Sequence, residues 1–297
     1  MYQTLLRVLF CRVELVMTND LDLKLKLFSG ATFKVDNMDI VPYTLKEIID
    51  YGYSRYMQNV QVLSIEKEDL ISSIENESNR KALEDQIEEV RAFDFFVKLG
   101  GLEMQQLMLM ALSMVLRAKD IRILEEKNIV VVDFIHLGII EEFGDGNYDF
   151  NTTKFDEIPD EQIKIIHREN FDEIVNIVKL QNYLSSPEKS EKKESNPADE
   201  ETRALIEHME MMKKKVQDKK RKQQKSEGGD IDMYDILDAV SVKSNSINKT
   251  NIFDLTIYQV YCEYARLELI DNYDFSIKAM MAGAKIDALK HWSSKLN

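Results

Sequence analysis

The residues best suited to binding a metal ion lie in one short loop. Residues 145–151 place Asp and Asn oxygens at alternate positions, as the first half of a calcium loop does, and Asp156 occupies the twelfth position. Two features oppose a calcium site, because Phe150 stands where the sharp turn requires glycine and the twelfth residue is not the usual Glu. A surface turn rich in Asn, Asp and Gly explains the same residues. We therefore expect no bound metal.

No catalytic or nucleotide-binding motif is present in the sequence. The four histidines are isolated, and neither Cys11 nor Cys262 has an adjacent base. The chain also lacks a GxxxxGK phosphate loop and a strand-linked GxGxxG motif. We expect a protein that is not an enzyme and uses no cofactor. An active site assembled from residues distant in sequence is the alternative that the sequence leaves open.

Two apolar stripes are candidates for binding a protein partner. Residues 102–118 are apolar nearly all the way round and rich in methionine, which adapts to varied apolar partners. Tyrosines recur at helical spacing after Leu255, and tyrosine suits interfaces as well as half-buried cores. The candidate partner-binding residues are Met104, Met108, Tyr258, Tyr261, Tyr264 and Trp292. Ordinary core packing is the alternative for both stripes.

A basic run stands out in an acidic chain. The net charge of −14 argues against a general nucleic-acid binder, yet residues 203–225 carry nine basic and only three acidic residues. No aromatic residue is interleaved to stack on bases, so an electrostatic tether to an acidic protein surface is favoured over DNA. The candidate tether residues are Lys213, Lys214, Lys215, Lys219, Lys220 and Arg221.

Composition and cysteine content suggest a protein of the reducing cytoplasm. Two cysteines far apart in sequence form no disulfide framework. No run of about 18 apolar residues is present, so no membrane span is predicted. Residues 1–16 are apolar but interrupted by charges, and they lack a signal-peptide cleavage site. They are either an upstream extension before a second start at Met17 or a first strand or short helix.

Strands are predicted in two hairpins. Residues 21–27 and 31–35 alternate apolar and charged residues around Ser29-Gly30, which predicts a hairpin. Residues 121–124 and 129–133 predict a second one.

The remaining elements of the first domain are expected to be helical. A Thr44–Glu47 capping box begins a helix that continues through Tyr56. Further helices are predicted at 66–77, at 80–99 up to Gly100-Gly101, and at 102–118, the last of them central and buried. Polar loop sequence follows until about Pro159. An Asn170–Glu173 capping box then opens a helix from Phe171 to about Tyr183.

These elements predict an α+β fold that is predominantly helical. Residues 17–184 form the α+β domain, and residues 185–202 form a flexible linker because they contain no large apolar side chains. Residues 203–229 form the basic helix, and residues 230–297 form a small all-α C-terminal subdomain.

One C-terminal block points to a family. The segments DLTIYQVYCEYARL (residues 254–267) and NYDFSIKAMMAGAK (residues 272–285) are followed by a closing Trp segment. The block resembles a group of tail-module proteins from phages and prophages of Gram-positive bacteria, often labelled tail assembly chaperones. Residues 166–174 (IHRENFDEI) and Asn196-Pro-Ala198 occur in the same order in that group. Residues 1–16 and Cys262 depart from the pattern.

This resemblance implies a non-catalytic role in tail morphogenesis within the host cytoplasm. A tail assembly chaperone binds the long, apolar tape measure protein, keeps it soluble and yields it to the tube protein. Self-association is compatible with such a role. The alternative is a structural tail or baseplate protein located in the virion tail.

Overall fold

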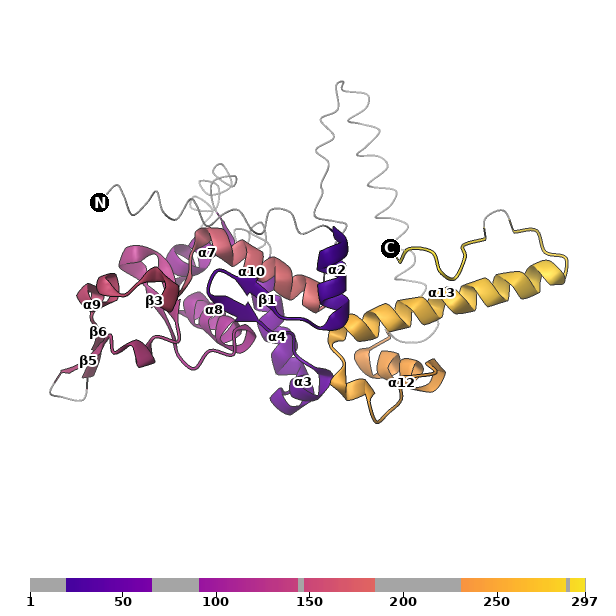
Figure 1. Cartoon of the computed structure of the whole chain (residues 1–297), viewed down its shortest axis with the longest axis horizontal. Helices are drawn as coiled ribbons and strands as arrows, with labels where there is room; N and C mark the ends of the chain where they lie inside the picture. The colour runs from indigo at the N-terminus through magenta and orange to yellow at the C-terminus, as the bar shows by residue number, and fades with distance from the viewer. Residues whose placement is uncertain (1–19, 66–90, 144–146, 185–230, 287–288, 297) are drawn as a thin grey trace, which may run out of the picture. The chain divides into compact units, whose positions relative to one another are not determined.

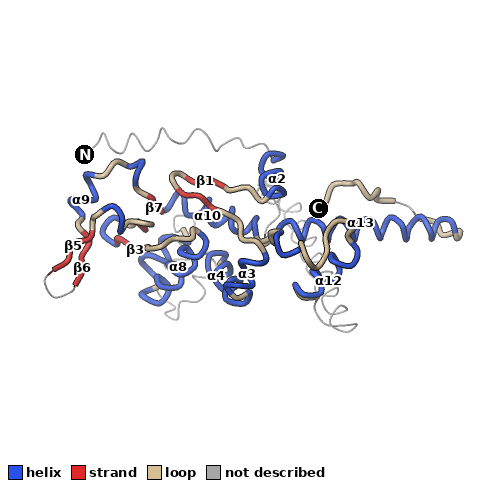
Figure 2. Tube along the Cα trace, turned by 60° about the horizontal axis from the view of Figure 1, so that its bottom comes forward, coloured by secondary structure: helices blue, strands red, loops and turns tan. Residues whose placement is uncertain are grey.

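The computed structural model describes residues 20–65, 91–143, 147–184, 231–286 and 289–296. The chain divides into two compact units: the first contains the chain up to Pro187 together with Phe253–Gln259, and the second contains Glu188–Ile252 and Val260–Asn297. Helices predominate in the described part, with strands confined to small antiparallel sheets (Figures 1 and 2). The predicted α+β, predominantly helical class is therefore confirmed.

The first described element is a helix, which corrects the predicted strand at 21–27. Helix α2 spans Asp20–Ser29 and ends at Gly30, whose φ of +68° suits glycine. The true hairpin comes later and is formed by β1 (Phe33–Val35) and β2 (Met38–Ile40). Its tight turn contains Asp36 at a φ of +49°, a conformation that Asp tolerates. An alternating sequence is thus insufficient by itself to form a strand.

The Thr44–Glu47 capping box is present and opens α3 (Leu45–Tyr51). The predicted single helix is divided at Gly52, which has a φ of +100°, and continues as α4 (Tyr53–Ser64). The helix predicted at 66–77 and most of the one at 80–99 lie outside the described residues. The end of the latter is described as α7 (Ala92–Asp94) and the π-helix η1 (Phe95–Leu99), and it stops at Gly100 as predicted.

Helix α8 spans Gly101–Val115 and packs against α4. The sequence predicts a helix buried on all sides, but only one face is buried, including Leu112 and Val115. On the opposite face Leu102 is 70% exposed and Met110 is 49% exposed. Apolar residue types alone therefore overestimated the burial of this helix.

The predicted second hairpin is confirmed. Strands β3 (Ile121–Leu124) and β4 (Ile129–Val132) pair antiparallel around the 3-10 turn η2 (Glu125–Lys127), and β7 (Lys164–Ile166) pairs with the other edge of β4. Asn128, at a φ of +52°, closes the turn.

The region predicted as loop up to Pro159 contains regular structure. It includes η3 (Ile135–Leu137), β5 (Ile140–Phe143) paired with β6 (Asn147–Phe150), α9 (Thr152–Glu157) and η4 (Asp160–Gln162). Sparse apolar residues hold this region together, because Phe134, Phe150 and Phe155 join Val131 and Ile163 in one buried cluster. The sequence prediction failed because these residues are separated by polar positions and meet only after folding.

Helix α10 spans Arg168–Gln181 and packs against α4, α7 and β1. Its buried residues include Ile174, Ile177 and Val178, as predicted. The helix begins earlier than predicted, however, because its N-cap is His167 and not Asn170. Asn170 is instead the N3 residue that completes the cap.

The described part of the second unit contains no strand. Helix α12 (Met233–Lys243) is capped by Asp232 and is followed by η6 (Ile252–Asp254) and the long helix α13 (Ile257–Met281). The first three residues of α13 belong to the first unit. The predicted linker (185–202) and basic helix (203–229) lie outside the described residues. Within the described ranges, no helix is long and apolar enough to cross a membrane.

Candidate functional site

The two methionine candidates occupy different environments. Met108 is fully buried on the face of α8 that contributes to the core. Met104 is half-buried, and its Cβ lies so close to Gly100 that a Cβ on that glycine would approach it to 2.6 Å. Met108 therefore contributes to the core, and Met104 borders it. None of the exposed apolar residues of this region was among the candidate partner-binding residues. They are Leu99, Leu102, Leu107 and Met110.

The aromatic candidates divide between the two compact units. Tyr258 belongs to the first unit, is buried, and lies with its ring centroid 5.8 Å from that of Tyr183. Tyr261 and Tyr264 belong to the second unit and are half-buried, and burial raises the pKa of Tyr261. Each of the three tyrosines is therefore buried or half-buried within its own unit.

Trp292 remains 48% exposed, although its backbone is anchored. Arg266 donates hydrogen bonds from one guanidinium nitrogen to the carbonyl oxygens of Trp292 (2.6 Å) and Ser294 (2.9 Å). The centroid of the His291 ring lies 5.1 Å from that of the Tyr273 ring and 5.4 Å from that of the Trp292 ring. The C-terminal tail is thus fixed onto α13, while the indole stays accessible. All six candidate tether residues, from Lys213 to Arg221, lie outside the described residues.

A long-range backbone contact in the first unit joins two helix starts. Thr44 and Thr256 form an isolated antiparallel β-bridge, and the Leu45 amide donates a 2.8 Å hydrogen bond to the Leu255 carbonyl. Each threonine also begins a helix through a reciprocal cap. Thr256 Oγ1 accepts from the Gln259 amide at 3.3 Å, and Gln259 Oε1 accepts from the Thr256 amide at 2.8 Å. Backbone pairing therefore joins the start of the C-terminal motif, within Phe253–Gln259, to the rest of the first unit.

The side-chain amide nitrogen of Gln259 makes a further hydrogen bond, to α2. Its Nε2 donates a 2.9 Å hydrogen bond to the Phe28 carbonyl at the end of α2. A Cβ on Gly30 would lie 3.5 Å from Gln259 Nε2, an ordinary van der Waals contact, so the positive φ and not a lack of space favours glycine at this position. One side chain thus satisfies unpaired backbone groups at the end of α2 and at the start of α13.

The helix start at Thr44 is also held by a charged cluster. Arg117 donates to both carboxylate oxygens of Glu47, at 2.7 and 3.0 Å, and its guanidinium lies 4.2 Å from the Tyr43 ring centroid. The hydrogen bonds from Arg117, opposed in part by desolvation and assisted by the Thr44 amide, lower the pKa of Glu47 to about 2. The Tyr43 hydroxyl donates to the Met114 carbonyl at 2.8 Å, which links the cluster to α8.

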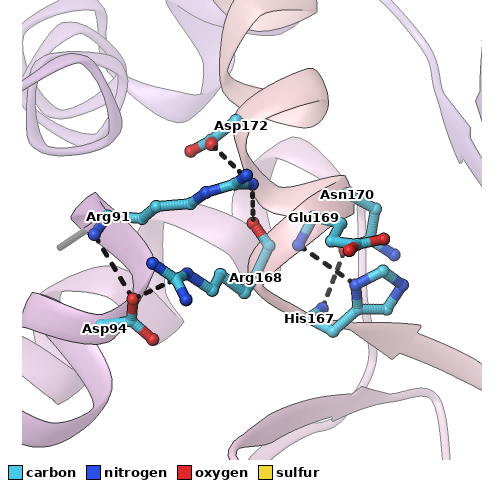
Figure 3. A network of polar contacts seen from close by, with 7 residues as sticks. All are labelled: Arg91, Asp94, His167, Arg168, Glu169, Asn170 and Asp172. Atoms are coloured by element: carbon cyan, nitrogen blue, oxygen red, sulfur yellow. Dashed lines mark hydrogen bonds and ion pairs between the residues drawn. The ribbon is translucent and has the colours of Figure 1, made fainter. Parts of the chain in front are cut away.

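A second polar network joins α7 to α10 (Figure 3). One guanidinium nitrogen of Arg91 donates hydrogen bonds to the Arg168 carbonyl oxygen at 3.2 Å and to the Asp172 carboxylate at 3.4 Å. The Arg168 Nε forms an ion pair with the Asp94 carboxylate at 3.0 Å. Each guanidinium therefore already has a carboxylate partner. The arrangement stabilises the packing of two helices, and it is not organised to bind an anion.

His167 lies at the edge of this network and caps α10. Its Nδ1 accepts a hydrogen bond from the Glu169 amide at 3.2 Å, while the Asn170 side chain accepts from the His167 amide at 2.8 Å. Asn170 also donates to Asp36 in the β1–β2 turn, at 2.8 Å. His167 therefore has a structural role as the N-cap of α10.

The candidate calcium loop is only partly described. Asp145 lies outside the described residues, and Asp156 forms an ion pair with Lys127. In the parts of the chain that the structure covers, no group of three His, Cys, Asp or Glu residues could hold a metal ion.

Comparison with known proteins assigns the C-terminal region. Residues 219–297 match the family model of the YomV second domain. This is a phage-related domain, and the match agrees with the phage origin that the C-terminal block suggests. A search of curated proteins and a search of solved structures found no match.

The region matched by the YomV second domain includes the C-terminal block and all of the aromatic candidate residues. It contains α12, α13, the aromatic candidates and the segment Phe253–Gln259 that belongs to the first compact unit. The IHRENFDEI segment and Asn196-Pro-Ala198 lie outside the match.

Proposed function

We propose that this protein is a non-catalytic phage tail assembly chaperone that binds and solubilises the tape measure protein in the host cytoplasm. One observation carries the proposal: a phage-related domain presents large apolar side chains to solvent along a helix. Phe275 is 74% exposed and Met281 is 84% exposed in the distal half of α13, and Met280 beside it is also exposed. Large apolar side chains that remain exposed on a folded domain are candidates for binding other proteins.

The chemistry of these residues suits a client that is long, apolar and helical. Methionine is flexible and polarisable, so it can pack against varied apolar surfaces without a preformed pocket. Phe275 supplies a rigid aromatic side chain in the same half of α13 as Met280 and Met281, and further exposed apolar residues lie on α8. Several weak contacts of this type would give avidity and still allow release to the tube protein.

Co-expression with the tape measure protein of the same phage tests the proposal. We expect the full chain to raise the soluble fraction of the client, and Phe275→Asp combined with Met281→Asp to remove most of that effect. Val242→Asp is the matched control, because Val242 is also 74% exposed but lies on α12. Equal client solubility with the chain present and absent would reject the chaperone function.

The alternative function is that of a structural tail or baseplate protein. Mass spectrometry of purified virions separates the two functions. A chaperone is expected in infected lysate but not in virions, whereas a structural protein is present in virions at a fixed stoichiometry.

A further inference from the structure

Helix α2 has apolar residues on two faces, because its sequence has the alternating pattern of a strand but adopts a helical conformation. Its leucines alternate with charged residues, so in a helix they cannot share one side. Leu27 is buried and Leu23 is half-buried. The other three large apolar residues, Leu21, Leu25 and Phe28, follow the i, i+4, i+7 spacing of a single helical stripe.

This outer stripe is exposed although the helix itself is anchored. Leu21 is 57% exposed, Leu25 54% and Phe28 64%. The Phe28 carbonyl accepts the hydrogen bond from Gln259, and the Leu27 carbonyl accepts one from Gly30. The backbone of α2 is therefore held in place while a complete apolar stripe faces solvent.

We propose that this stripe is a self-association surface, on which α2 of a second copy of the chain packs in antiparallel orientation. A twofold axis near Leu25 would place Leu21 of each copy opposite Phe28 of the other, so both ends of the stripe would be covered. The two copies would make the same contacts, as an isologous interface requires.

The charges of α2 favour the antiparallel orientation. The acidic residues Asp20 and Asp22 come first in the helix, and the basic residues Lys24 and Lys26 follow. Asp22 and Lys26 lie on the same flank of the stripe, one turn apart. Antiparallel packing brings Asp22 of each copy opposite Lys26 of the other, whereas parallel packing places like charges together. Lys24 lies on the other flank and is not part of these cross-copy pairs.

The size of the surface sets the expected affinity. A single ten-residue helix offers less area than a standard protein interface. We therefore expect a concentration-dependent dimer with a Kd on the order of 10–100 µM.

Sedimentation velocity of the full chain over a wide concentration range tests the proposal. The wild-type chain should shift from one to two copies as concentration rises, and Leu25→Glu should weaken association at least about tenfold. Leu25 is already solvent-exposed, so this variant should fold normally, which circular dichroism verifies. Val242→Glu, an exposed apolar position on α12, is the matched control and should associate as the wild type does.

A charge exchange tests the orientation. Asp22→Lys and Lys26→Asp should each weaken association about five- to tenfold at low salt, because each replaces two attractive pairs by two repulsive pairs. An equimolar mixture of the two variants should restore association, since every cross-copy pair is then attractive. The double variant D22K/K26D should also restore it.

Four results would overturn the proposal or its antiparallel arrangement. The chain could stay monomeric at several hundred micromolar, or it could associate equally well with Leu25→Glu. A chain that is monomeric as a whole but dimerises after deletion of residues 1–16 would identify its own N-terminus as the occupant. Association that depends on Leu25 but is not restored by the charge exchange would reject the antiparallel arrangement.

Discussion

The Glu47–Arg117 pair should contribute measurable, pH-dependent stability to the first unit. The pKa of Glu47 falls from 4.5 to about 2 on folding, mainly because Arg117 donates two hydrogen bonds to its carboxylate. A shift of this size corresponds to about 3 kcal/mol if taken at face value. The Glu47 side chain is 39% exposed, so solvent screening reduces the expected contribution to about 1–2 kcal/mol.

The sign of the pH dependence follows from the direction of the shift. Because the folded-state pKa is lowered, the stabilisation is fully present above the unfolded value of 4.5 and disappears as the pH falls towards about 2. Other carboxylates titrate in the same range, so the comparison must be made between the wild type and Glu47→Gln. Glutamine can still accept the Thr44 amide in the capping box, and the variant therefore removes the charge but keeps the cap.

Urea unfolding followed by circular dichroism at several pH values measures this difference. Urea is preferable to guanidinium chloride because a salt would screen the pair. We expect Glu47→Gln to cost about 1–2 kcal/mol at pH 7 and almost nothing near pH 2. In an Arg117→Met background the cost at pH 7 should largely vanish. A cost below about 0.3 kcal/mol at pH 7, or one independent of pH, would refute the reasoning.

Four further predictions concern local features of the chain. His167→Ala should destabilise the first unit by about 1 kcal/mol through loss of the α10 cap, whereas His167→Asn should cost much less, and thermal melting compares the two. Gln259→Leu should expose both the α2 and α13 ends, so hydrogen exchange of the Leu45 amide should accelerate more than in a Gln162→Leu control. Gly30→Ala should cost about 1 kcal/mol because of its positive φ, and a melting temperature equal to that of the wild type would contradict this. Titration with calcium should produce no binding heat, and a saturable signal would reinstate the loop around Asp156 as a metal site.

The parts of the fold that the sequence predicted are those specified by neighbouring residues. The Thr44–Glu47 cap, the β3–β4 hairpin and the end of a helix at Gly100 each depend on residues only a few positions apart. The buried stripe of α10 followed from helical spacing, even though its cap was misplaced to Asn170. Local hydrogen bonding and periodicity carry this information without knowledge of the rest of the chain.

The candidate residues were less well predicted, because residue type does not determine exposure. Met108 is buried while Met110, on the same helix, is half exposed. Tyr258 is buried in the first unit, and the exposed Phe275 was not among the candidates. Which side of a helix faces solvent depends on the elements that pack against the other side, and the sequence does not reveal these elements.

By itself, the sequence determined the class of the protein: a predominantly helical α+β chain with a phage-related C-terminal block. Tertiary structure alone decided that residues 21–27 form a helix and that the segment around Thr256 returns to the first unit. Both outcomes depend on contacts between distant residues, such as the hydrogen bond from Gln259 to Phe28 across 231 positions. An alternating pattern of leucine and charge satisfies either a strand or a helix with two apolar faces. The choice between them is made by the partners that cover those faces, and partners so far apart in the chain are identified only once it has folded.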